Sequence, residues 1–567
     1  MESRSWESLS NESQASSGQT LLSDDPKPGT WAEPKEVERS DLRLVRDDIS
    51  LDIFLVAVAE LSERFTYRAV TAPIQNYIQN TRDDPMHPGA LGMGQTVATS
   101  INYVFVGWCY LSPVLMGIIA DSLLGRYKTI VMGTGLSACG VLILFSTSLP
   151  VSLEHGAGLP GLMAALVLLG LGTGAIKSNV APLIAEQYHS IGARVKSLPD
   201  GEQVLVDPNV TIQAIYARYY WVINLGALSV IPVSWLELKV DFWAAFMLPL
   251  CFWALAIVAL LAGRTRYIVQ PPNGSAITKA MRVLWIGIKS GGSLEAARPS
   301  SLEKTGVSVQ WDDVFVDELK RALVACRVFL IFPLYWICNG QASSNLVSQG
   351  ASMDTHGIPN DMMGCLNPIT ILIAVPLFER FVYPTLHRFH IKFKPISRIT
   401  TGFLLASCAM ALAAGLQELI YETSPCQRNP TIDSCKGVPP ARKISLLLQI
   451  PVYCLMGLSE LLAMLSGMEY AYTKAPKSMR SIIMSLFLLA GAFGSSIGVS
   501  LSPTSVDPKV LIEYVSLSAT MLVAAIIFFL CFRKYNRMEE SMNKLLDADC
   551  PRRRSWDTDD TPRLERQ

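Results

Sequence analysis

Residues 240–262 read VDFWAAFMLPLCFWALAIVALLA, an apolar run whose one charged residue, Asp241, stands near its start. A helix that crosses a bilayer needs about 20 mostly apolar residues, because its backbone groups must bond within the segment once water is gone. Three further windows meet this test, at 398–418, 444–466 and 509–532. The chain is therefore predicted to be an integral membrane protein.

The composition supports a chain that lies largely in lipid. Of its 567 residues 50% are hydrophobic and 17% charged, against about 25% charged in ordinary soluble domains. Apolar stretches interrupted by Gly, Pro and a few polar residues complete the set of predicted spans. These are 51–78, 95–120, 129–149, 161–187, 212–237, 240–262, 326–349, 366–387, 398–418, 444–472, 480–502 and 509–532. The predicted fold is an all-α membrane protein with twelve transmembrane helices.

The polar stretches divide these spans into two equal sets. The longest internal polar stretch, residues 263–325, has six spans before it and six after it. This predicts two six-helix bundles, 48–262 and 326–533, joined by a cytoplasmic linker, with a substrate held between them near the bilayer midplane. Residues 1–47 are rich in Ser, Asp and Glu without apolar period and are predicted to be a disordered tail. Residues 534–567 form the second predicted tail.

Basic residues predict the orientation. The loops after the second, eighth and tenth spans, and the segment after the last span, are rich in Lys and Arg. Because basic loops stay in the cytoplasm, both termini are predicted to be cytoplasmic. The loop after the ninth span is an exception, since it is basic on the predicted outer side. It contains Cys426 and Cys435, whose pairing in a disulfide stays open.

Several classes of function are disfavoured. A formal net charge of zero gives no reason to expect nucleic acid as a partner. The twelve cysteines are scattered without metal-type spacing, so no metal site is predicted. We find no nucleophile triad and no phosphate-binding loop, which argues against an enzyme. No cofactor is expected.

Three predicted spans carry charges at their centres. They hold Glu60, Glu63 and Arg64 in the first span, Lys177 in the fourth and Glu460 in the tenth. Such a charge costs roughly 2.5–3.5 kcal/mol on insertion scales, so it usually faces a cavity or a partner. Two carboxylates beside one guanidinium cannot both stay ionised cheaply, which predicts a proton carrier. Lys177 and Glu460 would form a switchable salt bridge if the bundles face each other. The alternative is an ionic network that only fixes helix register.

Amides and an aromatic residue follow one face of the seventh span. Gln341, Asn345 and Gln349 recur at helical spacing after Trp336, as a stripe facing a cavity would. Asn367 adds an amide next to a proline at the start of the eighth span. This mixture suits a ligand with side chains and peptide bonds. Trp336 could instead be a residue of the membrane interface.

Four motifs identify a family resemblance from Asp48 to about Arg533. Glu60–Tyr67 fits E-x-x-E-R-F-x-Y, and Gly117–Gly135 reads GIIADSLLGRYKTIVMGTG. Tyr219–Leu228 fits F-Y-x-x-I-N-x-G-S with Ala227 in place of Ser, and Glu460 precedes GMEYAYTKAPKSMRS. The sequence thus resembles the proton-dependent oligopeptide transporters of the major facilitator superfamily, and among them the fungal branch.

The resemblance implies roles by position. The proton-coupling residues would be Glu60, Glu63, Arg64, Lys177 and Glu460. The substrate-binding residues, including those proposed from the polar stripe and from Arg68, would be Tyr67, Arg68, Lys177, Asn224, Trp336, Gln341, Asn345, Asn367 and Glu460. Lys177 would attract the peptide carboxylate, while Asn224, Asn367 and Glu460 would hold the amine. Asp121, Gly125 and Arg126 would form a gating loop.

Departures from the family pattern leave alternatives open. Arg68 replaces the second Tyr of a usual pair, and Thr71 stands where many members carry Arg. Gly340 and Tyr103 replace a Glu and a His found in other branches. The leading hypothesis is a symporter of protons with di- and tripeptides, acting as a monomer in the plasma membrane. The alternatives are a carrier of another small anion such as nitrate, and a non-transporting peptide sensor.

Overall fold

The computed structural model describes residues 43–45, 47, 51–84, 88–188, 194–197, 203–206, 208–269, 271–272, 274–303, 309–389, 393–423, 444–474 and 479–548. The chain divides into two compact units, a small one made of residues 1–48 and 190–214 and a large one made of the rest. Cys426 and Cys435, and with them the disulfide question, lie outside the described residues.

The small unit contains a three-stranded sheet. Strand β3 (Gln203–Val206) is central, with β1 (Arg43–Val45) parallel to it on one side and β2 (Arg194–Ser197) antiparallel on the other. Strand β1 lies within residues 1–47, the tail that the sequence predicts to be disordered, and for Arg43–Val45 this prediction is wrong. Its partner follows about 160 residues later, so the pairing leaves no local signal in the tail sequence.

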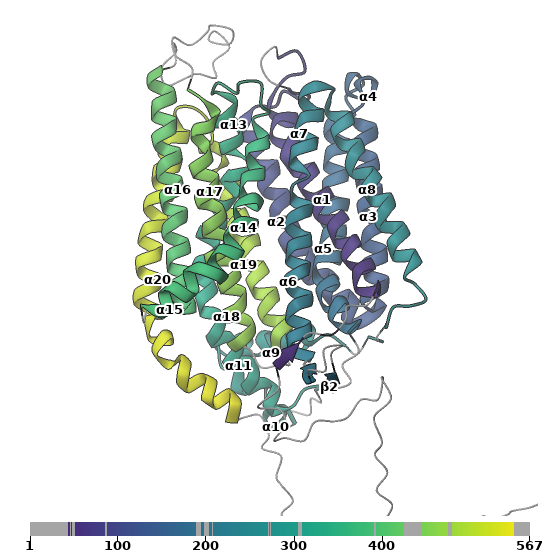
Figure 1. Ribbon diagram of the computed structural model, residues 1–567, viewed down its shortest axis with the longest axis vertical. Helices are drawn as coiled ribbons and strands as arrows, with labels where there is room; N and C mark the ends of the chain where they lie inside the picture. Colours follow the sequence, from purple (N-terminus) through teal and green to yellow (C-terminus); the bar gives the residue numbers. More distant parts are fainter. Residues whose placement is uncertain are drawn as a thin grey trace, which may run out of the picture. The chain divides into compact units, whose positions relative to one another are not determined.

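The large unit is helical, and of its helices only the start of Pro208–Ala227, residues 208–214, is assigned to the small unit. The helices of its first half are α1 (Leu51–Gln79), α2 (Gln95–Ile119), α3 (Arg126–Thr147), α4 (Pro150–Glu154), α5 (Gly158–Glu186), α6 (Pro208–Ala227), α7 (Val230–Lys239) and α8 (Phe242–Ala262). The helices of the second half are α12 (Phe332–Gly340), α13 (Asn345–Ala351), α14 (Leu366–Leu377), α15 (Tyr383–Arg388), α16 (Pro395–Thr423), α17 (Ile450–Glu460), α18 (Ser466–Lys474), α19 (Arg480–Leu501) and α20 (Lys509–Ala548). The two sets gather side by side as two bundles (Figure 1).

Within the described residues, eleven helical segments are long and apolar enough to cross a membrane. Helix α1, 29 residues long, is not among them because Glu60, Glu63, Arg64 and Arg68 make it polar. It nevertheless packs against α2, α5, α7 and α8 as the first helix of its bundle. With α1 counted, the helices occupy the twelve positions that the sequence predicts.

Three spans break, two of them where the sequence places functional residues. The seventh span changes from α12 through a turn at Gln341–Ser343 (η5) to α13. The tenth span becomes a π-helix over Leu461–Leu465 (η9), directly after Glu460. Local π-helices often accompany functional sites, because the extra residue re-aims neighbouring side chains. The fifth span divides into α6 and α7 near Ser229.

Aromatic packing holds each bundle together. In the second bundle the Phe332 ring contacts those of Phe403 and Phe487 edge to face, with centroids 5.4 and 5.3 Å apart. In the first bundle Tyr77 packs against Phe242 and Phe246 at 5.0 and 5.6 Å. Such pairs contribute about 0.5–1.5 kcal/mol each beyond area burial. They provide a rigid frame for the polar residues between the bundles.

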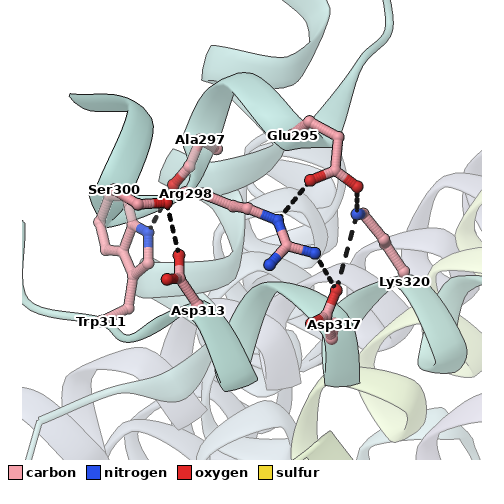
Figure 2. A network of polar contacts seen from close by, with 8 residues as sticks. All are labelled: Glu295, Ala297, Arg298, Ser300, Trp311, Asp313, Asp317 and Lys320. Carbon is pink, nitrogen blue, oxygen red and sulfur yellow. Dashed lines mark hydrogen bonds and ion pairs between the residues drawn. The ribbon is translucent and has the colours of Figure 1, made fainter. Parts of the chain in front are cut away.

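The predicted linker contains ordered helices, α9 (Ala276–Lys289), η2 (Leu294–Ala297) and α10 (Pro299–Leu302), followed by α11 (Asp313–Cys326). Figure 2 shows how charges tie η2 to α11: Arg298 pairs with Glu295 and, at 2.6 Å, with Asp317, while Lys320 pairs with Glu295. Trp311 Nε1 also donates to the Ala297 carbonyl at 2.9 Å. This network fixes the segment that joins the bundles.

The linker network should make a pH-dependent contribution to stability. Hydrogen bonds from Lys320 and then Arg298 lower the pKa of Glu295. A lowered pKa in the folded state gives stability that is present above the ordinary glutamate pKa and lost as the pH falls through the lowered value. We expect Glu295→Gln to reduce the thermal unfolding temperature slightly at neutral pH and less at acid pH. Scanning fluorimetry measures the unfolding temperature. An equal decrease at neutral and at acid pH would contradict a pH-dependent contribution of Glu295.

Candidate functional site

The charged residues of α1 form one buried cluster. Arg64 Nε lies 2.8 Å from Glu60 Oε1 and 3.2 Å from Glu63 Oε2. Both glutamates are 0% exposed. Neither Glu63 oxygen receives a hydrogen bond within the described part of the chain. The helical spacing that predicted the contact thus produces it, and the Thr173 side chain of α5 also interacts with the Glu63 carboxyl.

Lys177 of α5 lies next to this cluster. It interacts electrostatically with Glu63, Arg64 and Glu60, and its Nζ stands 4.3 Å from the centroid of the Tyr110 ring. A cation over an aromatic face gains roughly 0.5–2 kcal/mol. The fourth-span lysine therefore faces the first-span carboxylates, whereas the sequence predicts a pairing with Glu460.

Tyr110 connects the two bundles at the same level. Its ring lies 4.5 Å from that of Trp336 on α12, tilted by 56°. Trp336 is buried and its Nε1 has no acceptor among the described residues. Tyr110 also interacts electrostatically with Glu460 of α17. A cation on the first bundle and a carboxylate on the second thus flank one aromatic pair.

Glu460 has an amide partner instead of a cation. Asn367 Nδ2 of α14 donates to Glu460 Oε2 at 2.9 Å, and Asn367 Oδ1, which is buried, has no donor among the described residues. The predicted Lys177–Glu460 salt bridge is not formed in this structure, since Lys177 lies over Tyr110. Lys177 and Glu460 thus both interact with Tyr110 without pairing with each other.

The remaining first-bundle residues lie near this level. Tyr67 packs against Phe105 with centroids 6.0 Å apart. Arg68 is half-buried and interacts electrostatically with Tyr67 and Tyr110. Asn224 of α6 is buried, and its Nδ2 donates to the Tyr220 carbonyl at 2.9 Å. Over the described ranges neither Arg68 nor Lys177 has a carboxylate within ion-pair distance, although Glu63 and Glu60 interact with Lys177 over a longer distance.

Gln341 and Asn345, expected to face a cavity, are 0% exposed in this structure. Their amides donate to Glu513 Oε1 of α20 at 2.9 and 3.1 Å, and Gln341 also donates to the Tyr103 hydroxyl at 3.1 Å. Thr504 and Ser505 complete the shell of Glu513. The sequence analysis missed Glu513, because a lone Glu near the start of a predicted span gives no local sign of its partners. Substrate contact by the two amides stays a prediction.

Hydrogen bonds between the bundles are concentrated at one end. Among the described residues they come from α1 beyond Gln75, from α2 up to Tyr103 and from Ser234 of α7. The positions of the basic loops predict that this end faces outside, and we call these bonds the outer seal. Examples are Gln75 to Ser348 at 3.2 Å and Asn76 to Asn360 at 3.0 Å. The sequence analysis did not find the seal, since its partners are more than 120 residues apart.

The predicted gating loop joins α2 to α3. Asp121 lies in a π-helix (η1, Ala120–Leu124), and Gly125 then takes φ +78°, a left-handed conformation that favours glycine. Arg126 begins α3 and pairs with Glu186 near the end of α5. Asp121 interacts electrostatically with Arg126. The structure brings the predicted residues together and adds Glu186 as the missed partner.

The chain is similar to known transporters in both sequence and fold. A family model described as POT family matches residues 127–518. The chain is 41% identical to the peptide transporter PTR2 of Saccharomyces cerevisiae over 92% of this chain and 86% of the yeast protein. It is 42% identical to the peptide transporter PTR_A of Candidozyma auris over 90% of this chain and 86% of that protein. The crystal structure of the POT family transporter PepTSo matches its fold with a TM-score of 0.67 at 21% identity, covering 87% of this chain and 99% of that one.

Proposed function

The chain belongs to the POT family, and from this premise we propose that it is a proton-coupled symporter that imports di- and tripeptides by alternating access. One observation carries the proposal. Lys177 of the first bundle and Glu460 of the second flank the Tyr110–Trp336 aromatic pair, with Arg68 on the positive side. A zwitterionic peptide has the two opposite charges that this arrangement can bind, whereas a simple ion has one.

The polar partners suit the ends of a peptide. Asn367 Oδ1 and Glu460 are acceptors for an ammonium group, and Lys177 and Arg68 are donors for a carboxylate. Because the ends rather than the side chains carry these contacts, the carrier should tolerate many peptide sequences. Trp336 offers an apolar surface to one side chain.

Proton coupling follows from the adjacency of Lys177 and Glu63. When Glu63 is ionised, it competes with a substrate carboxylate for the positive charge of Lys177. Protonation of Glu63 removes this competitor, so a proton and a peptide favour each other's binding. Such mutual favouring is a coupling free energy between two sites, and it is reciprocal.

Alternating access requires one end of the carrier to be closed. The outer seal supplies that closure here through bonds such as Gln75 to Ser348. We place the protein in the plasma membrane with cytoplasmic termini, acting as a monomer without enzymatic activity. The charged loops at the end opposite the outer seal support this orientation.

Arg68 favours a second candidate, a carrier of another small anion. It adds a second positive charge that interacts with Tyr110, the ring over which Lys177 lies, and within the described residues no ion pair joins it to a carboxylate. Nitrate or an acidic metabolite would use this excess. A peptide would use it as a second donor for its carboxylate.

Uptake of a labelled dipeptide into proteoliposomes under an inward proton gradient tests the proposal. We expect gradient-driven uptake by the unmodified chain. In Arg68→Tyr the KM for dipeptide should rise about three- to tenfold, because one of the two positive charges that bind the peptide carboxylate is removed. Unlabelled dipeptide should compete and nitrate should not. Inhibition by nitrate alone would establish the anion carrier. Dipeptide binding without uptake would indicate a sensor instead.

A further inference from the structure

Two carboxyl groups meet inside the outer seal, one from each bundle. Glu237 of α7 is 3% exposed, and Asp361 at the start of η6 (Asp361–Cys365) is 2% exposed. Their carboxyl groups are within hydrogen-bonding reach of each other. One oxygen of each, Glu237 Oε2 and Asp361 Oδ1, has no protein donor among the described residues. Two carboxylates cannot hydrogen-bond unless one of them carries a proton.

The other oxygens are bound by neutral donors. Asn76 Nδ2 of α1 donates to Glu237 Oε1 at 2.9 Å, and Ser234 Oγ donates to Asp361 Oδ2 at 2.5 Å. Backbone amides of Asp361 and Met362 also interact with the Asp361 carboxylate. Having more donors, Asp361 is better suited to be the anion, and Glu237 to hold the proton.

No positive charge balances the pair within the described residues that face it. The neutral neighbours are the amides Asn76 of α1 and Asn360, the residue before η6. The titratable neighbours are Tyr453 of α17 and Cys365 of η6. Lys239, two residues after Glu237, is exposed with its Nζ 5.8 Å from the Trp235 ring. Two buried negative charges would therefore repel across the bundle interface without compensation.

We propose that Glu237 and Asp361 form a proton-binding site that controls closure of the outer seal, separate from the cluster of Glu60, Glu63 and Arg64. Closure takes one proton from the outer solution onto Glu237, whose Oε2–H donates to Asp361 Oδ1. Opening returns that proton to the same side, so it adds nothing to the transported charge. External acidity thereby favours the closed outer end. The inference rests on alternating access but not on the identity of the substrate.

Distances across the outer end, measured by pulsed electron paramagnetic resonance in proteoliposomes, test the site. Spin labels on noncanonical amino acids at Val151 and Leu448, which are 67% and 48% exposed, leave the native cysteines in place. In the unmodified chain the population with the short, closed distance should fall at least about twofold from about pH 5 to about pH 8. In Glu237→Gln, whose amide donates at any pH, it should stay constant.

Asp361→Asn provides a second variant and should also lose the pH response. Glu154→Gln is the matched control, since Glu154 is an exposed carboxylate whose side chain pairs with Arg82 at 3.7 Å; it should keep the response. A pH-independent distance in the unmodified chain, or an undiminished response in both Glu237→Gln and Asp361→Asn, would overturn the proposal. A chain that shows the response but takes up no dipeptide would refute the proposed function alone.

Discussion

Replacing Glu63 by Gln is expected to abolish proton-driven dipeptide uptake, with a loss of at least about a hundredfold. The Glu63 carboxyl is 0% exposed, touches Arg64 Nε at 3.2 Å and interacts with Lys177. The amide keeps the shape of the side chain but cannot release a proton. Uptake into proteoliposomes under an inward proton gradient measures the effect directly.

Exchange of labelled for unlabelled dipeptide without a gradient separates coupling from binding. Glu63→Gln resembles the permanently protonated chain, so Lys177 stays free for the peptide carboxylate and exchange should continue. Glu422→Gln, at an exposed position of α16, is the control and should leave both activities unchanged. Undiminished gradient-driven uptake in Glu63→Gln would show that another residue carries the coupling proton.

Sequence reasoning succeeded where contacts are local along a helix. Glu60 and Arg64 are four residues apart, and this spacing alone brings their side chains together. The spans were predictable for the same reason, because apolar length is a property of a continuous segment. Even α1, whose charges exclude it from a hydropathy criterion, was predicted as a long apolar stretch interrupted by a few polar residues.

Sequence reasoning failed where partners come from distant segments. Glu513 meets Gln341 from more than 170 residues away, and Arg126 meets Glu186 across two helices. Nothing in the sequence near Glu513 or Glu186 distinguishes these two residues from ordinary charged residues at the end of a span. The pairing expected for Lys177 with Glu460 is likewise decided by geometry, because Tyr110 and Asn367 supply each of them with a nearer contact.

Removing Arg64 should produce the largest loss of stability. Arg64→Gln leaves Glu60 and Glu63, both 0% exposed, without the guanidinium that neutralises them. Breaking a buried ion pair by deleting one member costs about 3–5 kcal/mol, since the remaining charge is uncompensated. Thermal unfolding in detergent should therefore occur at a clearly lower temperature. Arg82→Gln, which removes an ion pair between exposed residues, should cost no more than about 1 kcal/mol.

The same argument predicts how the loss can be reversed. The triple variant Glu60→Gln, Glu63→Gln and Arg64→Gln carries no charge in the cluster and should recover most of the stability while remaining inactive in gradient-driven uptake. An unfolding temperature of the triple variant as low as that of Arg64→Gln would mean that Arg64 stabilises α1 by packing rather than by charge. Recovery would instead show that the fold does not need the charges of this cluster, and that the charges serve transport.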